Sequence, residues 1–267
     1  MNWIITGDTH RNFSRFDNLK GMPESTAIII LGDVGLNYTL DKNDYYAKKA
    51  LCKNYPYKFY CVRGNHEARP GDVEGMKLSW DVNVSGMVWY EEDFPNIRYF
   101  QDWGVYRIDG LRTLVIGGAY SVDKHYRLAT GLRWFENEQL SLEEMNECAQ
   151  HAIQCPKFDL VLSHTCPRSV QPTDLFLNFI DQSLVDSSME DWMDSLARKI
   201  EWRLWLFGHY HSDRIEWPRV EQFSVEMECL QDIITRWNKY SKTGELDWWL
   251  PLSPKMKRTM EEENEKV

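Results

Sequence analysis

The chain has 267 residues and a formal net charge of −10, and 43% of its residues are hydrophobic. This length suits one large α/β domain, or two small ones, with ample apolar surface for a core. The acidic balance argues against general binding of nucleic acids through a basic face, because such binding depends on neutralising phosphates. No apolar run approaches the roughly 18 residues that a membrane helix requires, so no membrane partner is expected.

The cysteines and the start of the chain indicate the compartment. Six cysteines are scattered without a CxxC pair, as is typical of reduced thiols rather than of a disulfide framework or a zinc site. A strand is predicted over residues 3–6, which leaves no room for a secretory signal before it. We therefore expect a soluble, cytoplasmic protein, and no pattern indicates its oligomeric state.

Five predicted strands each lead into residues that can bind a metal. The strands are the apolar runs 3–6, 27–31, 59–62, 160–163 and 200–207. In open α/β sheets, ligands collect beyond the carboxyl ends of the strands, where the loops converge. The residues that follow these runs offer carboxylate, amide and imidazole groups, namely Asp8, His10, Asp33, Asn65, His164, His209 and His211. This set is sufficient for two cations that share one carboxylate.

Helices and a second group of strands fill the intervals. Helices are predicted over residues 41–54, with Asp41 as N-cap, and over 141–154, where Ser141 and Glu144 form a capping box. A meander of strands is predicted over 97–100, 104–108 and 111–116, with Asp109-Gly110 as a two-residue turn. We expect this meander to begin the second sheet.

The remaining segments carry weaker patterns. Residues 71–99 predict a long connection with short strands or a helix, and residues 170–200 predict a helical crossing on one rim of the cleft. One or two strands are expected within 212–230, followed by a helix over 232–240. The charged run 255–267 is expected to be frayed or disordered.

The ordered series Asp8-x-His10, Gly32-Asp33, Gly64-Asn65-His66-Glu67, His164 and Gly208-His209-x-His211 resembles the calcineurin-like metallophosphoesterase superfamily. The resemblance implies an α/β fold in which two mixed β-sheets pack as a sandwich, with helices on both outer faces. It places the family domain at residues 1–230, and residues 231–267 then form a C-terminal helical appendage and charged tail.

The resemblance also implies two divalent metal ions, which can be Mn, Fe, Zn or Ni. One would be held by Asp8, His10, Asp33 and His211, and the other by Asp33, Asn65, His164 and His209. A metal-activated water would attack phosphorus in line, and His66 would protonate the leaving group, since its ordinary pKa lies near neutrality. The alternative for His66 is a further metal ligand or a structural hydrogen bond.

The substrate is expected to be a small phosphoester, with a nucleotide favoured and monoester or diester left open. The residues proposed to bind it are Arg11, Arg63, Lys124 and Arg127. The segment that contains Lys124 and Arg127 can equally be a solvated loop. Protein phosphatases of the superfamily continue Gly-Asp with two residues and then Asp-Arg-Gly, whereas this chain has Leu36 and Asn37 in the first two of those places. A phosphoprotein phosphatase and a catalytically silent binding protein remain the alternatives.

Overall fold

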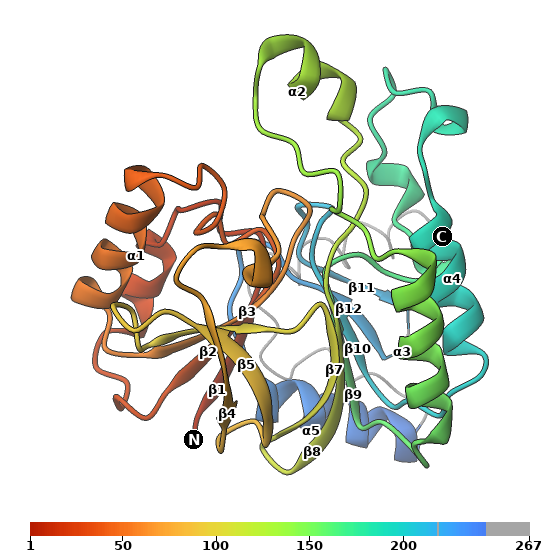
Figure 1. The fold of residues 1–267 in the computed structure, drawn as a ribbon. Helices are drawn as coiled ribbons and strands as arrows, with labels where there is room; N and C mark the ends of the chain where they lie inside the picture. The colour runs from red at the N-terminus through yellow and green to blue at the C-terminus, as the bar shows by residue number, and fades with distance from the viewer. Residues whose placement is uncertain (218, 244–267) are drawn as a thin grey trace.

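The computed structural model describes residues 1–217 and 219–243, so the charged run 255–267 lies outside the described residues. Two mixed β-sheets face each other, with helices on both outer faces (Figure 1). This arrangement confirms the predicted α/β sandwich. Within the described part of the chain, no helix is both long and apolar enough to cross a membrane.

The first sheet has seven strands in the order β13-β1-β2-β3-β6-β5-β4. Its strands are β1 (Trp3–Thr6), β2 (Ala27–Leu31), β3 (Lys58–Val62), β4 (Lys77–Asp81), β5 (Gly86–Tyr90), β6 (Ile97–Phe100) and β13 (Glu228–Cys229). The strands β1, β2, β3 and β6 run parallel, so the carboxyl ends of β1, β2 and β3 meet at one edge. The flanking strands β13 and β5 are antiparallel to their neighbours.

The second sheet has six strands in the order β11-β12-β10-β9-β8-β7. Its strands are β7 (Trp103–Ile108), β8 (Leu111–Ile116), β9 (Leu160–Ser163), β10 (Trp205–Phe207), β11 (Arg214–Trp217) and β12 (Val220–Gln222). The strands β8, β9, β10 and β12 run parallel. The turn between β7 and β8 consists of Asp109 and Gly110, as predicted.

Three apolar layers hold the sandwich together. Side chains from both sheets, such as Ile29 and Leu162, form the layer between them. The outer face of the first sheet packs against α1 (Lys42–Asn54) and the 3₁₀ turn η1 (Ser14–Leu19). The outer face of the second sheet packs against α3 (Leu142–Gln154) and α4 (Ser188–Ala197). The caps Asp41 and Ser141 are in place, the second with its capping box.

Two predictions about strands need correction. The strand over residues 97–100 does not begin the second sheet, because β6 pairs with β3 and β5 in the first. An apolar run identifies a strand but does not specify its partner, and this partner is distant in sequence. The strand predicted over 200–207 forms only at Trp205–Phe207.

Two predictions about helices also need correction. The segment around Lys124 is not a loop, since α2 (Lys124–Thr130) is helical and ends at Gly131 in the left-handed conformation. The crossing predicted over 170–200 consists of the 3₁₀ turns η3 (Arg168–Val170), η4 (Thr173–Leu175) and η5 (Gln182–Leu184), followed by α4. One more 3₁₀ turn, η2 (Pro70–Asp72), lies in the connection after β3.

The last described helix, α5 (Leu230–Thr243), is longer than the predicted 232–240. Its residues Leu230, Ile233 and Trp237 are buried within the layer between the sheets. The helical part of the segment after residue 230 therefore packs into the core. The division of the chain into a domain and an appendage at that residue stays a prediction.

Candidate metal centre

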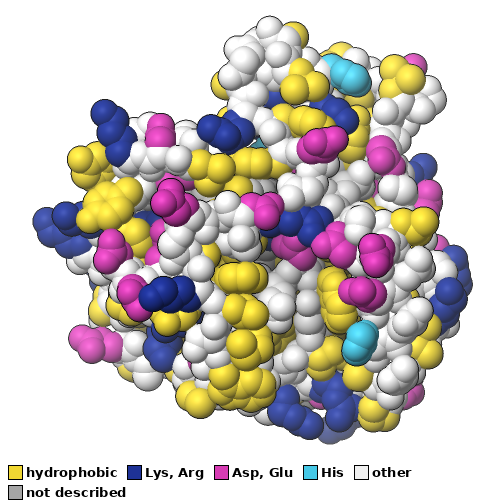
Figure 2. Space-filling model, in the orientation of Figure 1, with side chains coloured by type: hydrophobic (Ala, Val, Ile, Leu, Met, Phe, Trp, Pro, Cys, Tyr) yellow, Lys and Arg dark blue, Asp and Glu magenta, His cyan; other side chains and the backbone are white. Residues whose placement is uncertain are grey.

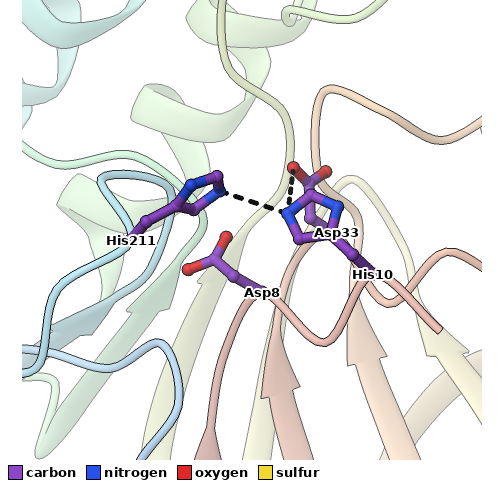
Figure 3. Close-up of side chains that lie close together, drawn as sticks. All are labelled: Asp8, His10, Asp33 and His211. Carbon is purple, nitrogen blue, oxygen red and sulfur yellow. Dashed lines mark hydrogen bonds and ion pairs between the residues drawn. The ribbon is translucent and has the colours of Figure 1, made fainter. Parts of the chain in front are cut away.

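The predicted metal-binding residues meet where the strands of both sheets end. One donor atom from each of Asp8, His10, Asp33 and His211 lies within 4.8 Å of the others (Figure 3). These residues follow β1, β2 and β10, which explains how positions up to 203 residues apart converge. Carboxylate oxygen and imidazole nitrogen suit a divalent transition metal, so this group fits the metal site that the sequence predicts.

Asp33 lies between this group and a second one. Its Oδ2 atom is 3.7 Å from Nε2 of His10, while its Oδ1 atom is 3.7 Å from Nε2 of His164. The side chain is buried, at 1% exposure. The two oxygens of one carboxylate thus lie near two different imidazoles, one from each group.

The second group consists of Asn65, His164 and His209 beside Asp33. Oδ1 of Asn65 lies 2.9 Å from Nε2 of His164, and the rings of His164 and His209 are 4.9 Å apart at their centroids. Nδ1 of His164 is 2.8 Å from the carbonyl oxygen of Leu31, which fixes Nδ1 as the donor. The lone pair of Nε2 is then available to a metal, in the tautomer that a backbone acceptor typically selects.

The protonation states of these residues suit metal binding. Burial lowers the pKa of His164 to about 4 and that of His209 well below its usual value, so both imidazoles are neutral. Burial and the neighbouring Asp33 raise the pKa of Asp8 well above its ordinary range. Burial opposes ionisation of Asp33 too, but His164, His66 and His10 keep its pKa low. A cation in this position would offset the repulsion between the two buried carboxylates.

The backbone at the site is held in an unfavourable conformation. Asp8, His10, Asp33, His209 and His211 all have positive φ, between 43° and 72°. Non-glycine residues rarely adopt this region, and clusters of such residues are found at functional sites. The conformation is supported by backbone hydrogen bonds from Asp8 and His10 to the carbonyl groups of Gly32 and Asp33.

Glycine is required at two positions where the loops approach His164 and Asp33. A Cβ atom at Gly32 would lie 2.0 Å from Nδ1 of His164, and Gly32 also has a φ of +90°. A Cβ atom at Gly64 would lie 2.0 Å from Oδ1 of Asp33. The glycines in the sequence blocks therefore allow the loops to approach within van der Waals contact of the metal-binding side chains.

Sequence reasoning missed two residues that orient the ligands, Ser121 and Glu138, and assigned no role to a third, Glu67. Asn65 donates from Nδ2 to Oγ of Ser121 at 2.8 Å, and Ser121 donates in turn to the carboxylate of Glu138, which turns Oδ1 of Asn65 toward His164. Glu67 accepts hydrogen bonds from the backbone of Gly35 and Gly64, and so joins two ligand loops. The contact between Asn65 and Ser121 spans 56 residues, so no local pattern marks it, whereas Glu67 belongs to the block Gly64-Asn65-His66-Glu67.

His66 lies at the wall of the same site. Its side chain is 18% exposed, with Nε2 at 3.9 Å from Oδ2 of Asp33. Its backbone N–H donates to Oδ1 of Asp33 at 3.0 Å. The guanidinium of Arg127, from α2, lies 3.2 Å from Nε2 of His66. The structure therefore places one of the four proposed substrate-binding residues next to His66.

The other three proposed substrate-binding residues have partners elsewhere. Arg11 is paired with the buried Asp44. Arg63 is buried and donates to Asp102 at 2.6 Å and to the carbonyl oxygen of Glu138. Nζ of Lys124 lies 4.1 Å from the ring centroid of Trp134. Each of the three thus has a contact within the fold, and its role in binding phosphate stays a prediction.

A pocket of about 310 Å³ opens at the metal-binding residues and His66. Asp33, Asn65, His66, His209 and His211 form one part of its lining. Most of the rest comes from two projecting segments, residues 118–138 and 168–187, which rise above the sheets in Figure 1, and Glu190 and Tyr210 complete the lining. Figure 2 shows hydrophobic side chains on these projections. Tyr126 and Phe179, which belong to the two segments, are exposed.

Comparison with known proteins identifies the family to which the chain belongs. Residues 1–213 match the family model described as calcineurin-like phosphoesterase. No curated protein sequence matches the chain. Among solved structures, the phosphopantetheinyl hydrolase of Mycobacterium tuberculosis is 12% identical with a TM-score of 0.43, and the match covers 95% of this chain and 96% of that one.

A second solved structure is the 5′-nucleotidase precursor of Thermus thermophilus, which is 16% identical with a TM-score of 0.36. This match covers 82% of the present chain but only 43% of the nucleotidase. The family match spans most of the chain and includes every residue of the metal centre, which confirms the resemblance seen in the sequence. The chain belongs to the calcineurin-like phosphoesterase family and is a metal-dependent hydrolase of phosphoric esters.

Proposed function

We propose that the protein hydrolyses a small phosphoester at a centre of two divalent metal ions. Asp8, His10, Asp33 and His211 would hold one ion, and Asp33, Asn65, His164 and His209 the other. The observation that carries this proposal is the position of Asp33, whose Oδ2 and Oδ1 atoms each lie 3.7 Å from an imidazole, that of His10 and that of His164. When bound, such ions supply an activated water and neutralise the phosphoryl oxygens.

His66 is proposed as the proton donor to the leaving oxygen. It lines the pocket and is the one histidine there that is not assigned to a metal. Hydrogen bonding of its backbone to Asp33 fixes its position relative to the metal-binding residues. The imidazole is thus held at the boundary between the metal centre and the rest of the pocket, where a leaving group would lie.

A small substrate is favoured over a phosphoprotein. The pocket volume of about 310 Å³ is typical of sites for small molecules. The positions where protein phosphatases have Asp-Arg are occupied by Leu36 and Asn37, which are both buried and offer no cation to a phosphate. A nucleotide is a candidate substrate, and a cytoplasmic location is part of the same proposal.

The test is the loss of metal and activity on changing Asp33 to Asn. An amide bridges two cations poorly, so Asp33→Asn should lose turnover of 4-nitrophenyl phosphate and bind less Mn²⁺, Zn²⁺ or Ni²⁺. The exposed Asp93→Asn is the matched control. Full turnover and full metal content in Asp33→Asn would exclude the bridging role. A protein that binds metal but hydrolyses no phosphoester would instead be the silent binding protein.

A further inference from the structure

The pocket changes in chemical character along its length. One part is lined by the polar residues of the metal centre, and another by apolar side chains. Apart from Val122, the apolar lining residues are Leu175, Phe176, Leu177, Ile180 and Val185. They all come from the projecting segment 168–187, which is built of short 3₁₀ turns beside α4 (Figure 1). A hydrolase that acted only on the phosphoryl group would have no use for this apolar part.

The apolar part is continuous with the metal centre. Tyr210 lies between the metal-binding residues His209 and His211 in sequence and lines the pocket with them. The ring of Phe176 stacks on the ring of Tyr210, with centroids 6.2 Å apart and an interplanar angle of 21°. A substrate whose phosphate reaches the metals would therefore extend its leaving group along Tyr210 toward Phe176.

A carboxyl group with one unused oxygen also lines the pocket. Glu190, in the first turn of α4, is only 3% exposed. Its Oε1 atom accepts a hydrogen bond from Oγ1 of Thr165 at 2.8 Å, whereas its buried Oε2 atom has no hydrogen-bond partner among the described residues. A buried polar atom without a partner is costly, so such an atom in a binding pocket points to a ligand that supplies the missing hydrogen.

The charges of the pocket disfavour a leaving group with further phosphates. Outside the metal-binding residues, the charged residues in the lining are Asp123, Arg168, Asp186 and Glu190. Asp123 is already paired with Arg127 at 2.8 Å. One arginine then remains against two carboxyl groups, so a second phosphate would meet more acid than base.

We propose that the substrate is a phosphoester of an apolar or aromatic alcohol that carries an N–H donor. Its apolar part lies against Phe176, Leu177 and Ile180, and its amine or amide hydrogen is accepted by Oε2 of Glu190. This specificity rests on the proposed hydrolysis of phosphoesters at the metal centre. It differs from specificity for a nucleotide, which would need cations for its charge and polar partners for its sugar.

The probes are three phosphate monoesters with alkyl leaving groups of similar reactivity. Ethyl phosphate reaches only the metal centre, benzyl phosphate adds the aromatic ring, and 4-(aminomethyl)benzyl phosphate adds the N–H donor. We expect kcat/KM to rise by about tenfold from ethyl to benzyl phosphate and by about tenfold again for the aminomethyl ester. Each rise corresponds to roughly 1.4 kcal/mol of binding, first from the ring and then from the amine. Adenosine mono- and diphosphate are expected to be poorer substrates than benzyl phosphate. Equal kcat/KM for all three esters, or a preference for the nucleotides, would overturn the proposal.

Variants then locate the two contacts. Leu177→Ala combined with Ile180→Ala should reduce the preference for benzyl over ethyl phosphate to about twofold or less. Phe179→Ala is the matched control, since Phe179 lies in the same segment, is 81% exposed and does not line the pocket. Glu190→Gln should remove the preference for the aminomethyl ester, whereas the exposed Asp191→Asn, one residue further along α4, should keep it. The proposal is contradicted if the preference for benzyl phosphate survives in the double variant and the preference for the aminomethyl ester survives in Glu190→Gln.

A binding experiment separates this proposal from the proposed function. The alcohol 4-(aminomethyl)benzyl alcohol should bind to the metal-free protein, as seen in ligand-observed NMR, and Glu190→Gln should weaken its binding by about tenfold. Absence of turnover for every ester, with this binding intact, would defeat the proposed hydrolysis but not the subsite. Turnover of 4-nitrophenyl phosphate without any binding of the alcohol would defeat the subsite alone.

Discussion

The guanidinium of Arg127 lies 3.2 Å from Nε2 of His66, across 61 residues of sequence. Arg127 belongs to α2, on a segment that projects from the sandwich, whereas His66 follows β3 at the metal centre (Figure 1). The arginine is held in place by Asp123 at 2.8 Å and by the hydroxyl of Tyr38 at 3.2 Å. A fixed cation from the projection thus lies beside His66.

This contact predicts unequal effects for the two cations of α2. Arg127→Ala should raise KM for a phosphoester by about tenfold, or roughly 1.4 kcal/mol, because the cation beside His66 is lost. Lys124→Ala should change KM by less than about twofold, since its ammonium group lies over Trp134. Steady-state kinetics on one substrate measure both. Equal effects of the two substitutions would show that α2 acts only through its overall charge.

The proposed role of His66 predicts a dependence on the leaving group. His66→Ala should reduce kcat for alkyl phosphates on the order of 10²–10⁴-fold, the usual contribution of a general acid. The loss should be much smaller for 4-nitrophenyl phosphate, whose leaving oxygen hardly needs a proton. Comparable losses on both kinds of ester would make His66 a binding or structural residue. The comparison must use enzyme with matched metal content.

The sequence predicted the parts of the site that depend on local order. Strands that end in Asp, Asn or His converge when the strands are parallel, which is why the seven candidate ligands from Asp8 to His211 lie together. The turn at Asp109-Gly110 and the cap at Ser141 are also local features, and both are present. In each case the residues that determine the feature lie within one short stretch of the chain.

The parts that escaped prediction depend on partners that are distant in sequence. The placement of β6 in the first sheet depends on its pairing with β3. The hydrogen bond from Asn65 to Ser121 arises only once both sheets are assembled, and Glu190 lies beside Thr165 only once α4 packs on the second sheet. A glutamate on an amphipathic helix is usually solvated, so nothing in its neighbours marked Glu190 as buried.

The hydrogen bonds around Ser121 predict an indirect effect on metal binding. Ser121→Ala removes the acceptor that holds the amide of Asn65, so Oδ1 of Asn65 would no longer be fixed toward His164. Partners of this kind typically contribute 10–100-fold to metal affinity. We expect a loss of that size for one of the metal-binding steps in a calorimetric titration. Ser183→Ala, at an exposed serine of η5, is the control and should titrate as the parent protein does.

Burial of Glu190 predicts a pH dependence of stability. Burial raises the pKa of Glu190 to about 7 from its ordinary 4.5, so the folded state holds this proton more tightly than the unfolded state. The stabilisation of the folded state by this bound proton is fully present below about pH 4.5 and is lost as the pH rises through 7. Glu190→Gln does not titrate, so relative to the parent it should gain on the order of 3 kcal/mol in unfolding free energy between pH 5 and pH 8.

Urea denaturation of both proteins at the two pH values measures this gain. Asp191→Asn serves as the control because its side chain is exposed on the same helix. A difference between Glu190→Gln and the parent that is the same at pH 5 and pH 8 would show that Glu190 titrates alike in the folded and unfolded states.

The last prediction concerns the buried ion pairs that attach α5. Arg236 is 1% exposed and donates to the carboxylates of Glu221, at 2.8 Å, and Glu228, at 2.6 Å. Arg236→Met would leave both carboxylates buried without their cation, which typically costs about 3–5 kcal/mol. Arg198→Met, which removes an arginine that is 69% exposed and paired with Asp194, should cost less than about 1 kcal/mol.

The cost of Arg236→Met should also depend on pH. Burial already raises the pKa of Glu228 to about 7 in the presence of Arg236, and it raises the pKa of Glu221 too. Without the arginine both values rise further, so the folded variant retains protons that the unfolded chain releases. The destabilisation should therefore be largest near pH 8 and shrink toward pH 5, where the carboxyl groups can be neutral. Denaturation curves at both pH values decide this, and a cost that does not change with pH would mean that packing of the arginine side chain, rather than its charge, holds α5 in place.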